Sequence, residues 1–126
     1  MSEIALGTAL LVLAGLAVLQ LLAVAGLPVG RVMWGGAHRV LPRRLRLGSA
    51  VSTLIYAAIA VVLLSRGRVL PGGGSTVVVV LTWAAAVFFT LSVPLNAVSR
   101  SAAERWTMAA ASAVLAVAAV ILALVP

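Results

Sequence analysis

The side chains that could do chemistry are few, and they gather in two stretches of the chain. Residues 30–49 hold Trp34, the only histidine, His38, and five of the nine arginines. Residues 96–105 hold Asn96 and Glu104, one of only two carboxylate side chains. His38 could act as a general base or proton relay with Glu104, although a lone histidine more often orders a loop by hydrogen bonding. We therefore assign no catalytic residue and treat Trp34, His38, Asn96 and Glu104 as a candidate functional cluster.

Several chemistries are excluded by residues that the chain lacks. There is no cysteine, no aspartate and no lysine, and the acids are Glu3 and Glu104 alone. Disulfides, thiolate metal sites and cysteine nucleophiles are therefore excluded, and carboxylate clusters for Mg²⁺ lose their plausibility. A single histidine cannot make a credible metal site. We expect no metal and no cofactor.

The elements that must position these residues are transmembrane helices. The 126 residues are 64% hydrophobic and only 9% charged, against about 25% charged in soluble domains. We expect one all-α polytopic membrane domain, residues 1–126, with helices at about 4–27, 47–65, 76–98 and 106–125. The first apolar run could be a signal peptide, but its length and the acidic Glu3 before it favour a retained helix. Short connections predict two antiparallel hairpins.

Polar residues within the apolar runs predict which helix faces point inward. Ser49, Ser52, Thr53 and Tyr56 recur at helical spacing, and such a stripe should face the protein because polar groups in lipid need partners. With Gln20, this stripe could line a polar path, but interhelical hydrogen bonding is the more common role.

Small residues predict where helices pack closely. In the first helix we expect a face through Thr8, Gly15 and Gly26. In the fourth we expect an alanine-rich stripe, which also contains Ser112. Pro94 should loosen the end of the third helix beside Asn96.

The start of the fourth helix carries a local capping signal. Ser101 and Glu104 have the Ser-x-x-Glu spacing of a capping box. We also expect Glu104 to form an ion pair with an arginine of the first connection, which would join the two hairpins.

The arginines predict the orientation in the membrane. Seven lie in the first connection (residues 28–46) and the third (residues 99–105), and two lie in the second (residues 66–75). The positive-inside rule therefore places the first and third connections in the cytoplasm and both termini outside. Anionic lipid headgroups, and not nucleic acid, are the expected partners of these charges. The candidate headgroup-binding residues are Arg39, Arg43, Arg44, Arg46, Arg100 and Arg105.

Two motifs resemble those of a group of small four-helix bacterial membrane proteins. One is Trp34-Gly-Gly-Ala-His38, after the first helix, and the other is the Asn-x-x-Ser-x-Ser-x-x-Glu-Arg segment from Asn96 to Arg105. The resemblance covers nearly the whole chain and implies the same architecture in a bacterial cell membrane. It implies no activity, because we know of none established for the group.

Three functions remain open at this point. The first is a non-enzymatic membrane protein that packs with itself or with a larger partner and presents a basic cytoplasmic face. The second is a small oligomeric channel or carrier for an anion or a lipid. The third is an enzyme acting on a lipid phosphate through His38, Glu104 and nearby arginines.

Overall fold

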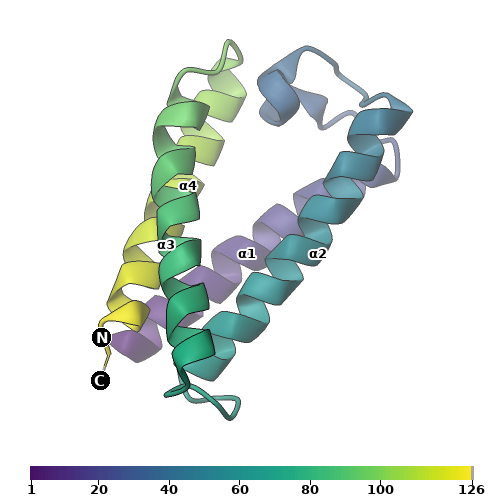
Figure 1. The fold of residues 1–126 in the computed structure, drawn as a ribbon. Helices are drawn as coiled ribbons and strands as arrows, with labels where there is room; N and C mark the ends of the chain where they lie inside the picture. Colours follow the sequence, from purple (N-terminus) through teal and green to yellow (C-terminus); the bar gives the residue numbers. More distant parts are fainter. Residues whose placement is uncertain (126) are drawn as a thin grey trace.

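The computed structural model describes residues 1–125 as four long α-helices joined by short connections (Figure 1). The helices are α1 (Ser2–Val24), α2 (Arg43–Arg66), α3 (Thr76–Ala97) and α4 (Ala102–Ala123). Two short 3₁₀ turns, η1 (Gly30–Val32) and η2 (Trp34–Gly36), lie in the first connection. All four helices are long and apolar enough to cross a membrane, and 22 residues span about 33 Å at 1.5 Å per residue. The all-α polytopic fold is confirmed.

The helices form two antiparallel hairpins, α1 with α2 and α3 with α4. The hairpins meet at the end that carries both chain termini and the second connection, and they diverge toward the other end (Figure 1). The first and third connections lie at that wider end, where η1 and η2 contact α4. The first connection therefore bridges the gap between the two hairpins.

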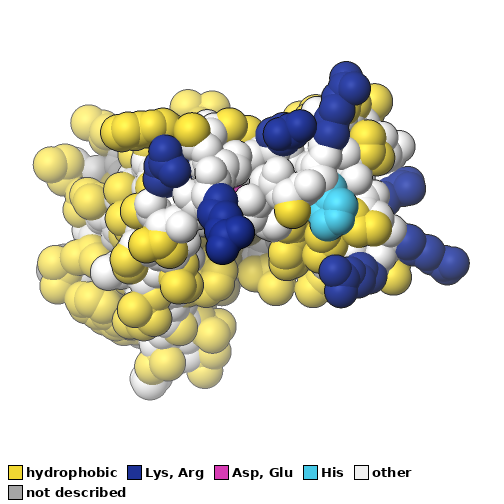
Figure 2. All heavy atoms as spheres, turned by 90° about the horizontal axis from the view of Figure 1, so that it is seen from above, with side chains coloured by type: hydrophobic (Ala, Val, Ile, Leu, Met, Phe, Trp, Pro, Cys, Tyr) yellow, Lys and Arg dark blue, Asp and Glu magenta, His cyan; other side chains and the backbone are white. Residues whose placement is uncertain are grey.

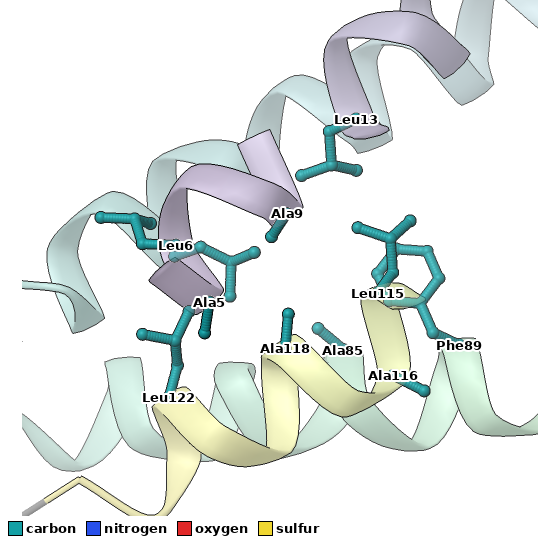
Figure 3. Close-up of a cluster of buried hydrophobic side chains, with 11 residues drawn as sticks. Ala5, Leu6, Ala9, Leu13, Ala85, Phe89, Leu115, Ala116, Ala118 and Leu122 are labelled. Carbon is teal, nitrogen blue, oxygen red and sulfur yellow. The ribbon is translucent and has the colours of Figure 1, made fainter. Parts of the chain in front are cut away.

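The main apolar core occupies the narrow end of the bundle (Figure 3). Ala5 and Ala9 of α1 face α4 across this core, and Ala118 of α4 is buried there. Alanines let the two backbones approach closely, which strengthens van der Waals packing in lipid. The other buried members of the core are Leu6, Leu13, Leu63, Ala85, Phe89, Leu115, Ala116 and Leu122.

The predicted packing faces of α1 and α4 had different outcomes. On α4, Ser112, Ala116 and Ala123 of the predicted small-residue stripe are buried, whereas its other two members, Ala109 and Ala113, are half-buried. On α1 the prediction was wrong, because Thr8 and Gly15 are exposed and the buried face runs through Ala5, Ala9 and Leu13 instead.

Two helices begin earlier than predicted. Helix α2 begins at Arg43 and not at residue 47, directly after the extended residue Pro42. Helix α4 begins at Ala102 and not at residue 106, because Ser101 caps it by accepting from the Glu104 N–H at 3.3 Å. Apolar composition marks the hydrocarbon core, whereas these helices continue for about one more turn into the interface. Helix α1 ends at Val24, three residues before the predicted end at 27.

Arginines fix both ends of α2 to its neighbours. Near its start, Arg46 donates from Nε and Nη2 to the Val24 carbonyl oxygen, at 2.9 and 2.8 Å. At its end, the buried Arg66 donates to the Gly73 oxygen at 2.8 Å and to the carbonyls of Ala123 and Val125. These carbonyls lie at or beyond helix C-termini, which lack intrahelical donors. Both arginines therefore stabilise the bundle internally.

Candidate functional site

A polar cavity lies between the two hairpins at their wider end, below the first connection. Its volume is about 220 Å³, and all four helices contribute to its wall. In a bundle built mainly of apolar residues, such a gathering of polar side chains is unusual because each costs free energy in lipid. The polar residues of the wall are Gln20, Ser52, Tyr56, Ser92, Asn96, Glu104 and Ser112.

Met33 and Trp34 form the roof of this cavity. The Trp34 indole donates from Nε1 to the Ser49 hydroxyl at 3.0 Å, and its ring lies so close to α2 that a Cβ at Gly48 would stand 2.9 Å from it. Trp34 has a φ of 52°, in the left-handed region that L-residues other than glycine rarely adopt. This backbone conformation turns the indole onto α2 and closes the roof from that side.

The roof is also attached to the start of α4. The Gly35 N–H donates to Glu104 Oε2 at 3.1 Å, and the Ser101 hydroxyl donates to the Arg31 carbonyl oxygen. A Cβ at Gly36 would stand only 2.3 Å from the Ser101 Cβ, so only glycine allows this approach. The predicted tie between Glu104 and the first connection exists, but within residues 1–125 a backbone amide makes it and not the expected guanidinium.

Two buried polar side chains on the cavity wall keep unused capacity to accept hydrogen bonds. Gln20 and Glu104 are each only 7% exposed. Within residues 1–125, Gln20 Oε1 has no hydrogen-bond partner, and leaving a buried acceptor unsatisfied costs about 1–3 kcal/mol. A carboxylate has about four acceptor positions, and the Gly35 N–H uses one of those on Glu104. The wall is therefore rich in acceptors that a bound molecule could satisfy.

Asn96 uses its polar group to join α3 to α4. Its Nδ2 donates to the Ser112 hydroxyl at 3.2 Å and to the Met108 carbonyl oxygen at 3.5 Å. Asn96 lies two residues after Pro94 and bonds between helices at the edge of the cavity. A donor held by two acceptors is fixed in orientation, so Asn96 contributes rigidity to the wall.

The structure brings three of the four predicted cluster residues together. Trp34, Asn96 and Glu104 all line the cavity. His38 does not, because it lies exposed on the outer face, which carries the arginines (Figure 2). The less favoured alternative, a relay between His38 and Glu104, is therefore not supported by this arrangement. Gln20 also lines the cavity, although it is not in the predicted cluster. It is the one strongly polar residue of the first apolar run, and this could have indicated its role.

The six predicted headgroup-binding arginines fall into two groups. Arg46 bonds to the end of α1, and Arg105 donates from Nη1 to the Ser99 carbonyl oxygen at 3.0 Å. The other four are exposed on the connections or at the start of α2, and Figure 2 shows basic side chains spread over this face. The exposed four are Arg39, Arg43, Arg44 and Arg100.

Comparison with known proteins adds no relative. No family model, no curated protein and no solved structure matches the chain. The function must therefore be argued from the cavity itself.

Proposed function

We propose that this membrane protein binds a small molecule in the cavity between its hairpins. The observation that carries the proposal is the buried Gln20, whose Oε1 lacks a partner on the wall of a cavity that all four helices line. Buried polar groups in proteins nearly always have partners, so an exception on a cavity wall points to a missing one. A bound molecule with a hydrogen-bond donor would supply it.

Binding fits this geometry better than catalysis. An enzyme acting on a lipid phosphate would need cationic groups beside Glu104, and no arginine or histidine lines the cavity. Substrate phosphates are held by guanidinium groups, and the guanidinium groups of Arg39, Arg43, Arg44 and Arg100 lie exposed outside the cavity. The cavity therefore lacks the cationic groups that the third hypothesis requires.

The exposed arginines support the second part of the proposal, the orientation of the protein in the membrane. They collect at the wider end, and juxtamembrane arginines are typical of cytoplasmic faces that contact anionic headgroups. We place this end at the cytoplasmic surface of a bacterial cell membrane, with both termini outside. A tag at the N-terminus should then react with impermeant reagents on intact cells.

The test of binding is a co-purification that compares two matched variants of α2. Ser52 lines the cavity, whereas Ala57 is exposed on the same helix. Wild type, Ser52→Phe and Ala57→Phe are purified from native membranes, and bound small molecules are identified by mass spectrometry. We expect a molecule that is present with wild type and Ala57→Phe and lost with Ser52→Phe, because the new ring fills the cavity. Identical molecules in all three samples, or none in any, would contradict the proposal.

One observation favours association with a partner as a second function. Gly7 and Gly15 of α1 are exposed, and a Cβ at either would meet no atom within 4 Å. Their face is open to close approach by another helix. Gly15→Leu should leave the fold of the single chain intact but weaken any self-association, measured by cross-linking in membranes. An unchanged cross-linked dimer would exclude this face.

A further inference from the structure

We propose that the ligand of the cavity is a small organic cation, a protonated amine with an apolar body of about the size of one aromatic ring. The inference rests on the proposed function and adds the chemical class of the molecule. It is carried by the hydrogen-bonding capacity that remains free on the wall, by the aromatic residues of the wall, and by the absence of basic side chains from it.

The wall carries donors as well as acceptors, because the Ser52 and Tyr56 hydroxyls and the Gln20 amide can donate. Two other N–H donors are engaged, Trp34 Nε1 with Ser49 and Asn96 Nδ2 with Ser112. Among the described residues, the buried acceptor without a partner is Gln20 Oε1. Glu104 adds a buried carboxylate whose known partner is a neutral backbone amide, so its charge is not compensated by that bond. A group that only donates and carries positive charge matches this wall, and an ammonium is such a group.

Aromatic residues are part of the same wall. Trp34, Tyr56, Phe88 and Phe89 line the cavity together with apolar side chains. The faces of aromatic rings attract cations, and the attraction increases when water is excluded. The volume of about 220 Å³ corresponds to about seven water molecules at about 30 Å³ each. It therefore suits a one-ring amine and is smaller than the usual pocket for a drug-sized molecule.

The positive charge of the outer face does not contradict a cationic ligand. No arginine and no histidine lines the cavity. The exposed arginines are screened over about 8 Å at physiological salt, whereas a buried carboxylate is screened much less. Within the cavity, the nearer and less screened charge is that of Glu104.

Three probes that differ mainly in charge test this inference on the full chain in lipid nanodiscs. Benzylamine is cationic at neutral pH, benzyl alcohol is neutral and benzoate is anionic. Binding is measured by calorimetry, with empty nanodiscs as the blank for partition into lipid. We expect wild type to bind benzylamine at least tenfold more tightly than benzyl alcohol, and benzoate not at all. This ranking is measured on wild type, so it does not depend on whether a variant folds.

Two matched variants then assign the charge effect to one carboxylate. Glu104→Gln removes the charge but keeps an oxygen for the Gly35 N–H, whereas Glu3→Gln removes the other acid, which is exposed in the first turn of α1. The affinity for benzylamine should fall at least tenfold in Glu104→Gln and stay unchanged in Glu3→Gln, and the affinity for benzyl alcohol should stay unchanged in both.

The outcomes separate this inference from the proposed function. If benzyl alcohol or benzoate binds as tightly as benzylamine, or if Glu104→Gln keeps full affinity for benzylamine, the cationic ligand is refuted while a binding cavity stands. If no probe binds, the cationic ligand is refuted and the co-purification decides on the cavity. If benzylamine binds equally well to Ser52→Phe, the probe sits outside the cavity, so the cationic ligand is refuted and the co-purification again decides on the cavity.

Discussion

Replacing Gly36 by alanine should detach the first connection from α4, and Gly35 provides a matched control. Both glycines have positive φ, 72° and 80°, so alanine at either costs about 1–2 kcal/mol in backbone conformation. Only at Gly36 would the new Cβ collide, at 2.3 Å from the Ser101 Cβ, whereas at Gly35 it would meet nothing within 4 Å.

The collision sets the magnitude of the effect. To relieve it the connection must move away from α4, which breaks the bonds from Ser101 to Arg31 and from the Gly35 N–H to Glu104. A neutral hydrogen bond contributes about 0.5–1.5 kcal/mol and one to a charged group about 1.5–3 kcal/mol. Gly36→Ala should therefore be about 2–4 kcal/mol less stable than Gly35→Ala.

The assay is unfolding of both variants by sodium dodecyl sulfate in mixed micelles, combined with hydrogen exchange at the Gly35 amide. We expect exchange at this amide to be fast in Gly36→Ala, because its acceptor is withdrawn, and slow in wild type. Equal unfolding free energies for the two variants, with a protected amide in both, would refute the account of how the connection is held.

Three further substitutions test side chains at the cavity end. Trp34→Phe keeps a ring over Gly48 but removes the Nε1–H that donates to Ser49. We expect the free energy of unfolding to fall by about 1 kcal/mol. A loss below about 0.3 kcal/mol would show that this bond does not hold the roof. Arg46→Gln removes two bonds to the Val24 carbonyl oxygen and should cost about 1–3 kcal/mol. By contrast, Arg44→Gln changes an exposed side chain and should leave stability within about 0.5 kcal/mol while weakening attraction to anionic lipid in a liposome flotation assay. Equal losses of stability in Arg46→Gln and Arg44→Gln would contradict a structural role for Arg46 and a headgroup-binding role for Arg44.

The fold could be predicted from the sequence because it depends on local properties. Apolar length is sufficient to predict a spanning helix, and the cap of α4 follows from Ser101 and Glu104 three residues apart. Most residues of α1 are apolar, and lipid accepts an apolar face in any direction, so small residues alone do not mark its inward face. Small residues such as Gly15 therefore gave the wrong face, whereas the polar Gln20 is in fact buried.

The site could be predicted only in part, because its assembly depends on the path of the first connection. Glu104 and Gly35 are 69 positions apart, and no local pattern says which donor reaches that carboxylate. At the positive φ values of Trp34, Gly35 and Gly36, the half-exposed indole packs on α2 while His38 remains exposed outside the cavity. Residue types alone placed His38 in one cluster with Trp34, Asn96 and Glu104, whereas the path of the backbone keeps His38 away from the cavity that the other three line.

The left-handed conformation of Trp34 affects how often the cavity is covered. A residue with a side chain held at a φ of 52° carries about 1–2 kcal/mol that is released when the segment relaxes. A difference of about 1.4 kcal/mol is a factor of ten in an equilibrium constant. The strain at Trp34 therefore favours release of the roof by about a factor of ten relative to its contacts alone.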